Sequence, residues 1–196
     1  GALNAEGKDV VVIGGGDTAM DCVRTAIRQK AKSVSCLYRR DRANMPGSQR
    51  EVQNAEEEGV AFKWLSAPQA FLGDDHVTAV QAQKIHLGQP DATGRQVPQI
   101  IDGSSHDLPA DMVIKALGFD PEDIPTMFGA PELEVSKWGT ISIDWRSMMT
   151  SLPGVFAAGD IVRGASLVVW GVRDGRDAAT QIDQWIMAQA PAAASA

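Results

Sequence analysis

Two groups of residues near the start of the chain have the types and spacing needed to bind phosphate. Gly14, Gly16 and Ala19 form a Gly-x-Gly-x-x-Ala pattern directly after the β-branched run 10–13. In such a turn the first glycine permits a tight bend, the second lets the backbone approach a phosphate, and the alanine keeps the next helix close to the strand. The first turn of that helix presents unpaired N–H groups and the positive end of the helix dipole. We therefore expect a diphosphate site made of Gly14, Gly15, Gly16, Asp17, Thr18 and Ala19.

The residues around the glycines support a strand–turn–helix unit. A strand is expected over 10–13 and a second strand over 33–38, and between them apolar residues recur at helical spacing. The residues of that apolar face are Ala19, Cys22, Val23, Ala26 and Ile27. This order is typical of a dinucleotide-binding βαβ unit. The alternative is a structural strand, turn and helix that binds no nucleotide.

The second group of residues follows the second expected strand and is basic. At this place a site for NAD has a carboxylate that accepts hydrogen bonds from the ribose, whereas a site for NADP has arginines for the 2′-phosphate. Arg39 and Arg40 occupy the place here, with Arg42 close by. Guanidinium–phosphate contacts are charge-assisted and short, so we expect NADP specificity. Asp41 weakens this interpretation because it could serve a ribose, and the alternative is a solvated basic cluster paired with Asp41.

Composition limits the classes of protein that remain. The chain has 196 residues and a formal net charge of −7, which argues against a general nucleic-acid binder. No run approaches the roughly 20 apolar residues that span a bilayer, and no secretory signal is visible. The only two cysteines, Cys22 and Cys36, form no CxxC pair. We expect two free thiols in a reducing cytoplasm.

A helix and several strands are expected after the basic group. Ser48 and Glu51 have the spacing of a capping box, and the helix they begin is expected to run to Glu58 and stop at Gly59. The acidic run 56–58 is interpreted as a solvated face. A strand is expected over 60–65.

Residues 76–116 have the character of a β-meander. Strand-like runs at 77–87, 95–101 and 111–117 are separated by turn-rich segments. Pro98 places the middle run at a sheet edge, and the last run is apolar enough for a central parallel strand. Ala116, Leu117 and Gly118 at its end are further candidate cofactor contacts, since Gly118 permits the close approach of a ligand.

The remainder has a different organisation. Prolines and glycines over 121–131 indicate a linker, and a strand is expected over 139–144. A second, buried strand is expected over 153–160, ending at Gly159 and Asp160. A long helix is expected from about Ala165 to Gln189. From the residues alone, Gly159 and Asp160 could equally form an Asx-capped turn.

Several motifs, in this order, resemble one family. They closely resemble the C-terminal part of the small subunit of bacterial NADPH-dependent glutamate synthase, within the wider pyridine nucleotide-disulfide oxidoreductase-like flavoproteins. The resemblance covers essentially the whole chain. The residues that carry it are 14–22, 38–40, 45–48, 56–59, 114–119, 155–160, 164–170 and 173–177.

The resemblance implies an α/β fold with two parts. Residues 1–118 would be a Rossmann-like, three-layer NADPH-binding domain with a β-meander, and residues 119–196 the C-terminal part of an FAD-binding domain. Asp160 would accept a hydrogen bond from a ribityl hydroxyl of FAD, and Gly159 would allow the close approach. A helix starting near Ser166 would direct the N–H groups of Leu167 and Val168 at the flavin.

The resemblance also implies an activity. The chain would belong to an enzyme that passes hydride from NADPH to FAD, and then electrons through iron–sulfur clusters to the glutamate-forming large subunit. No catalytic side chain is expected, since the chemistry belongs to the cofactors. The chain begins with Gly1 and has neither an FAD fingerprint for the adenosine half nor a cysteine-rich region. We therefore expect a fragment that binds no iron–sulfur cluster and little FAD.

Three alternative functions remain open. The first is an NADPH-dependent flavoprotein oxidoreductase with another electron acceptor. The second is a non-catalytic module that senses nucleotides. The third is a disulfide reductase like thioredoxin reductase, which the lack of a CxxC dithiol disfavours.

Overall fold

The structure, a computed structural model, describes residues 3–90 and 96–189 of the chain. The fold has two compact units, Gly1–Gly118 and Phe119–Ala196.

A four-stranded parallel sheet forms the centre of the first unit. Its strands are β1 (Asp9–Ile13), β2 (Ser33–Leu37), β3 (Ala61–Lys63) and β8 (Met112–Lys115), in the order β3-β2-β1-β8. Side chains alternate between the two faces of a strand. Both faces of β1 are accordingly buried, each in a separate hydrophobic core. Such burial on both faces explains the unbroken apolar run that precedes the glycines.

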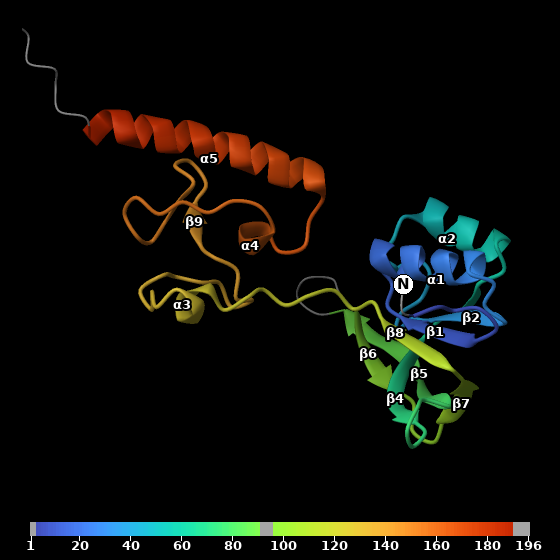
Figure 1. Ribbon diagram of the computed structural model, residues 1–196. Helices are drawn as coiled ribbons and strands as arrows, with labels where there is room; N and C mark the ends of the chain where they lie inside the picture. The colour runs from blue at the N-terminus through green and yellow to red at the C-terminus, as the bar shows by residue number, and fades with distance from the viewer. Residues whose placement is uncertain (1–2, 91–95, 190–196) are drawn as a thin grey trace, which may run out of the picture. The chain divides into compact units, whose positions relative to one another are not determined.

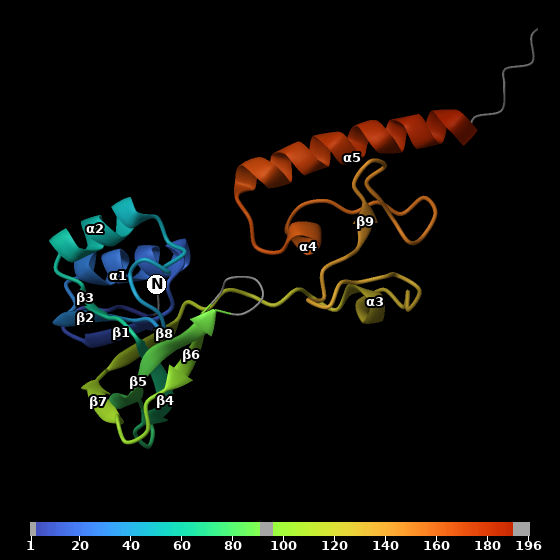
Figure 2. The same ribbon diagram turned by 180° about the vertical axis from the view of Figure 1, so that it is seen from behind.

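Two helices cover one face of this sheet. They are α1 (Asp17–Arg28) and α2 (Gln49–Glu57), and both lie on the same side of the sheet in Figures 1 and 2. Ala19 and Val23 of α1 are fully buried, as is Val52 of α2. They pack with Val10 and Val12 in the larger core of the unit.

The β-meander covers the opposite face. It consists of β4 (Ser66–Leu72), β5 (Ala79–Pro90), β6 (Gln96–Ile100) and β7 (His106–Pro109). The other three strands each pair antiparallel with β5. Val80 and Ala82 of β5 pack against Val11 and Ile13 of β1. Helices, parallel sheet and meander thus form three layers, which confirms the predicted α/β fold class.

Some details of the meander differ from expectation. β4 and β7 were not expected, and each is held by pairing with β5 rather than by an apolar run of its own. β5 extends to Pro90, past the predicted end at Leu87, while 91–95 lie outside the described residues. β6, which contains Pro98, pairs with β5 at the edge of its sheet as predicted. β8 is parallel, but it lies at the edge of the described sheet, so its predicted central place is wrong.

The predicted capping box does not form. Ser48 precedes α2, but its side chain makes no capping hydrogen bond. Glu51 instead pairs with Arg24 of α1. The helix ends as expected, with Gly59 at a φ of +98°.

The second unit is built around a small core and one long helix. Its elements are α3 (Ile124–Met127), β9 (Ile143–Asp144), β10 (Met149–Thr150), α4 (Asp160–Arg163) and α5 (Val168–Gln189), most of them labelled in Figure 1. Leu133, Ile141 and Val162 form the buried core. The ring of Trp185 in α5 meets Phe156 edge-on at 6.2 Å between centroids. A side chain at Gly154 would meet the same indole within 2.8 Å.

Three expectations for this unit are wrong in detail. The segment 121–131 contains α3 and is not simply a linker. Residues 153–160 are not a buried strand, because their backbone makes a single bridge, between Met149 and Phe156, and Val155 is 42% exposed. The long helix begins at Val168, three residues after Ala165.

Two kinds of feature are absent from the described residues. Between 3 and 90 and between 96 and 189, no helix is both long enough and apolar enough to cross a bilayer. Within the same ranges, no cluster of three His, Cys, Asp or Glu side chains is arranged to hold a metal ion.

Candidate functional site

The carboxyl ends of three parallel strands bring the predicted site residues of the first unit to one edge of the sheet. β1 ends at Ile13 and leads into the glycine turn, β2 ends at Leu37 just before the arginines, and β8 ends at Lys115. Ile13 is paired with Leu37 on one side and Lys115 on the other, so the three ends are level. Ligands of open α/β sheets bind outside this edge.

The three glycines of the turn have different surroundings. Gly14 has a φ of +149°, and a Cβ there would lie 2.2 Å from the carbonyl oxygen of Ala116. A Cβ on Gly15 would lie 2.3 Å from the ring of Tyr38. By contrast, a Cβ on Gly16 would meet no atom within 4 Å. Gly14 and Gly15 therefore pack against the protein, while Gly16 presents its backbone to open space where a ligand can approach.

The start of α1 is suited to an anion. Gly16 occupies the N-cap position, and no described side chain caps the helix there. The N–H groups of Ala19 and Met20 donate to the Gly16 carbonyl at 3.0 and 3.3 Å. Asp17 and Thr18 precede them in the first turn and are exposed, and their N–H groups are the first-turn donors that would face a ligand. A diphosphate can satisfy such first-turn donors and interact with the helix dipole. Ala19 itself is fully buried, which keeps α1 against the sheet.

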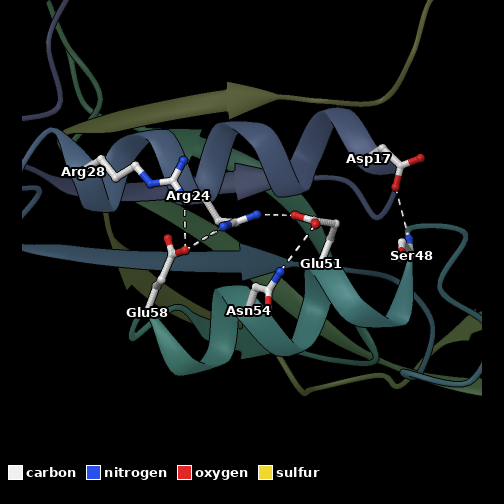
Figure 3. Close-up of polar contacts among 7 residues, drawn as sticks. All are labelled: Asp17, Arg24, Arg28, Ser48, Glu51, Asn54 and Glu58. Carbon is white, nitrogen blue, oxygen red and sulfur yellow. Dashed lines mark hydrogen bonds and ion pairs between the residues drawn. The ribbon is translucent and has the colours of Figure 1, made fainter.

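A loop between β2 and α2 is attached to the glycine turn. The N–H of Gly47 donates to the carbonyl of Gly15 at 2.9 Å, and the N–H of Ser48 donates to Oδ1 of Asp17 at 3.1 Å (Figure 3). The hydroxyl of Tyr38 donates to the carbonyl of Asn44 at 3.0 Å. These bonds fix the segment that carries the arginines relative to the turn, and the sequence alone gave no signal for them.

Arg39 and Arg40 differ from Arg42 in their partners. Arg39 is exposed, and the Nε of Arg40 is buried without a hydrogen-bond partner among the described residues. A buried N–H donor without a partner is costly, so an anion here would relieve the cost. Arg42 is already engaged, with Nη1 2.8 Å from a carboxylate oxygen of Glu56.

Asp41 has a local role. Its Oδ1 accepts hydrogen bonds from the backbone N–H of Asn44 at 2.9 Å and from its side-chain amide at 2.7 Å. Asp41 thus closes the turn that follows the arginines. This engagement weakens both the ribose interpretation of Asp41 and the interpretation of the cluster as arginines neutralised by Asp41.

The residues after β8 border the same edge. Ala116 is 8% exposed and donates its N–H to the carbonyl of Ile13 at 2.8 Å. Leu117 is largely exposed, and Gly118 has a φ of +88°. Ala116 therefore belongs to the floor beneath Gly14, while the next two residues are accessible.

The two cysteines are free thiols, as predicted. Cys36 is fully buried beneath the glycine turn, with Sγ 3.5 Å from the carbonyl oxygen of Gly14. Burial raises the pKa of the Cys36 thiol to about 12 and also raises the pKa of Cys22. Neither thiol has the low pKa of a reactive cysteine.

In the second unit, Gly159 and Asp160 form the start of α4. Gly159 has φ +79° and ψ −151°, a conformation that favours glycine, and a Cβ there would meet no atom within 4 Å. The side chain of Asp160 is exposed at the first position of α4. The turn can therefore accept a close neighbour on its open side.

Ser166 and Leu167 precede α5, and Val168 begins it. All three residues are exposed. The carbonyl of Leu167 accepts from the N–H of Trp170 at 2.9 Å, which marks Leu167 as the residue before the helix. The exposed N–H groups of the first turn therefore start at Val168, slightly later than expected.

One polar contact in this unit has no signal in the sequence. Arg163 at the end of α4 forms two hydrogen bonds with Asp174 of α5, from Nε at 2.5 Å and from Nη2 at 2.7 Å. Asp174 is 1% exposed. The two residues are eleven positions apart and belong to no pattern of regular spacing, so only the folded chain shows the pair.

Comparison with known proteins gives close relatives. The chain is 67% identical, over 98% of its length, to the glutamate synthase [NADPH] small chain of Azospirillum brasilense, of which it covers 40%. It is 48% identical, over 94% of its length, to the glutamate synthase [NADPH] small chain of Escherichia coli, of which it again covers 40%. The chain thus spans less than half of the length of these curated relatives.

The fold and the family are also matched. Thioredoxin reductase of T. acidophilum superposes with a TM-score of 0.74 at 23% identity, over 93% of this chain and 54% of that one. At this identity the likeness shows the fold alone. Residues 1–192 match the family described as pyridine nucleotide-disulphide oxidoreductase. The chain therefore belongs to the pyridine nucleotide-disulphide oxidoreductase family.

Proposed function

We propose that this chain is the NADPH-binding and part of the FAD-binding region of an NADPH-oxidising flavoprotein, the small subunit of a glutamate synthase. The observation that carries the proposal is the pairing of two anion sites at one sheet edge. One is the uncapped start of α1 beside Gly16, and the other is the partly buried Arg40 with the exposed Arg39. The similarity to two glutamate synthase small chains supports the choice of enzyme.

Gly1–Gly118 is the proposed NADPH domain. The diphosphate would lie against Gly16 and the N–H groups of Asp17 and Thr18, and the 2′-phosphate against Arg39 and Arg40. Arg42, paired with Glu56, would support the segment rather than bind phosphate directly. Leu117 and Gly118 would border the nicotinamide half because they follow β8 at the same edge.

Phe119–Ala196 is proposed as the C-terminal part of the FAD domain. The open side of Gly159 and the exposed carboxylate of Asp160 fit a ribityl chain. The exposed segment at Ser166, Leu167 and Val168 would hold the flavin ring, where the positive dipole end at the start of α5 would stabilise negative charge on the bound cofactor. The bound cofactors supply hydride transfer from nicotinamide to flavin, and this chain binds and orients them.

The remaining parts of the electron path are proposed for polypeptide outside this sequence. An iron–sulfur cluster takes about four cysteine ligands, and the sequence has two cysteines in all. We place the clusters and the adenosine half of the FAD site in residues that precede this chain. The large, glutamate-forming subunit is the proposed electron acceptor, and the cytoplasm is the proposed compartment.

An anaerobic titration of the natural polypeptide, meaning this chain together with the preceding residues proposed above, tests the function. NADPH should bleach the flavin absorption band, and NADH should do so far more slowly. Addition of the large subunit with glutamine and 2-oxoglutarate should restore the band and yield glutamate. Binding of NADPH without bleaching would favour the sensing module, and reoxidation only by another acceptor would favour the alternative oxidoreductase.

A further inference from the structure

A buried carboxylate in the second unit is not used by the proposed chemistry. Asp174 lies in α5, and its side chain is 2% exposed. It accepts two hydrogen bonds from the guanidinium of Arg163. That guanidinium lies over two indole rings, 4.7 Å from the centroid of Trp145 and 5.1 Å from that of Trp170. The ion pair is therefore fixed in direction by a bidentate contact and by ring faces on the arginine.

The pair holds the segment that contains Gly159 and Asp160. Arg163 is the last residue of α4, and its backbone N–H donates to the carbonyl of Gly159 at 3.0 Å. The N–H of Gly164 closes the same short helix on the carbonyl of Asp160 at 2.8 Å. One side chain at the end of this segment thus connects the whole turn to α5.

Glycine residues stand at both ends of this segment. Gly159 and Gly164 have φ values of +79° and +80°, and glycine gains such freedom at the cost of a more mobile backbone. Arg163 most strongly, and the backbone N–H of Gly159 more weakly, lower the pKa of Asp174 by hydrogen bonding. The two hydrogen bonds from Arg163 therefore connect the last residue of the segment 159–163 to α5.

We propose that Asp174, acting through Arg163, is a positioning residue for the flavin: it sets the Gly159–Asp160 turn at a fixed place relative to the start of α5. The inference rests on the proposed function, because it takes this turn and the start of α5 as the FAD contacts. Asp174 touches no cofactor itself. Its effect is to keep two separate contact segments in register before the cofactor binds.

A purely structural role is the competing explanation. Buried ion pairs are weak contributors to stability compared with apolar residues of the same volume. Stability alone therefore gives a poor reason for a bidentate pair at this place, whereas the precise placement of a binding turn gives a good one. The two explanations differ in whether FAD affinity or only folding depends on Asp174.

The test uses three variants of the natural polypeptide, each stripped of FAD and titrated with it. In Asp174→Asn the guanidinium of Arg163 loses its charged partner. In Arg163→Lys the positive charge remains, but the two-pronged hydrogen bonding of the guanidinium is lost. The matched control is Asp177→Asn, because Asp177 lies in the same helix, is exposed, pairs loosely with Arg173 at 3.6 Å, and acts on Arg163 through its charge rather than through a hydrogen bond. For each protein the FAD dissociation constant, the spectrum of bound flavin and the melting temperature of the FAD-free form are measured.

We expect Asp174→Asn to weaken FAD binding about tenfold or more, a size typical of residues that orient a binding group. Arg163→Lys should show a smaller loss with a shifted flavin spectrum, and Asp177→Asn should stay within about twofold, as for an exposed pair. A lower melting temperature with unchanged FAD affinity and spectrum would overturn the inference. If Asp174→Asn does not fold, unchanged affinity in Arg163→Lys overturns it.

Failure of the proposed function has a different outcome. A parent protein that binds no FAD, or that is not reduced by NADPH, would remove the proposed function. A parent protein that does both, with variants that bind FAD like the parent, would remove only the role of Asp174.

Discussion

At the glycine turn, what lies beside each Cα decides which residue can meet a ligand. Gly14 and Gly15 have protein atoms where a side chain would be, and Gly16 has open space. The three glycines look alike in the sequence, yet two of them are required by packing. Of the three, only Gly16 has a backbone that a ligand such as phosphate can approach on its open side.

The arginines lead to a prediction about cofactor choice. Changing both Arg39 and Arg40 to Glu should abolish the preference for NADPH over NADH, because two cationic donors become repulsive carboxylates. Each charged hydrogen bond contributes about 1.5–3 kcal/mol. Each arginine should therefore account for a preference of about ten- to hundredfold. The ratio of kcat/KM for the two nucleotides measures it.

Lys30→Glu is the control for these variants. It reverses an exposed charge just beyond the C-terminal end of α1, at the other end of the helix from the glycine turn. It should leave the ratio unchanged. An unaltered ratio in the double Arg variant would move the 2′-phosphate site elsewhere.

At the scale of elements, α1 and α2 are joined by a polar seam. Arg24 of α1 pairs with Glu51 and with Glu58, the latter at 2.8 Å, and Arg28 also reaches Glu58 at 3.1 Å (Figure 3). The acidic run 56–58 is therefore only partly a solvated face, as Glu56 and Glu58 are both paired. The sequence could not show this, because the arginine partners lie on other elements.

The seam predicts a pH-dependent contribution to stability. The hydrogen bond from Arg24 lowers the pKa of Glu58 below its ordinary value of 4.5. A carboxyl whose pKa is lowered by folding stabilises the folded state at pH values above its unfolded-state pKa. That stabilisation is lost as the pH falls through the folded-state pKa. Glu58→Gln should thus lower the free energy of unfolding at neutral pH, and the difference from the parent should shrink below 4.5. Urea unfolding across this range measures it.

Glu57→Gln serves as the control for the seam. Glu57 is exposed and accepts only a hydrogen bond from Gln53 at 2.9 Å, which a glutamine can retain. Its unfolding curve should follow that of the parent at each pH. A constant difference between Glu58→Gln and the parent at all pH values would show that the seam acts by packing and not by charge.

At the scale of the whole molecule, the two units differ in what they contain. The first unit has a sheet covered on both faces. In the second, α5 leaves large apolar side chains exposed, such as Val168 at 83% and Ile186 at 54%. The short length relative to the relatives agrees with the proposal that further polypeptide completes the second unit.

This difference predicts separate binding properties for the 196-residue chain. Alone, it should bind NADPH at a single saturable site and should retain no stoichiometric flavin. The reason is that the proposed NADPH site lies wholly within Gly1–Gly118, whereas the proposed FAD site is only partly present. Isothermal titration and the visible spectrum of the purified chain measure the two. A strong flavin band at one FAD per chain would contradict the prediction.

Local patterns were sufficient for the βαβ unit. A glycine turn after β-branched residues, and a helical face after it, determine β1, α1 and β2, because these contacts are close in sequence. The place of Arg39 and Arg40 just after β2 follows from the same local pattern. Pro98 likewise predicts an edge strand, since proline lacks the donor that a second neighbour would need.

The remaining features depended on tertiary contacts. β4 and β7 form because both pair with β5. Residues 153–160 do not form a strand, because among the described residues they make one isolated β-bridge and no continuous strand pairing. The pairing of Arg163 with Asp174 and the engagement of Arg42 by Glu56 join elements distant in sequence. By itself the sequence determined the local backbone shape and charge from which the phosphate sites are predicted. Only the tertiary structure decided which polar groups remain available to them, because that depends on which partners the fold brings together.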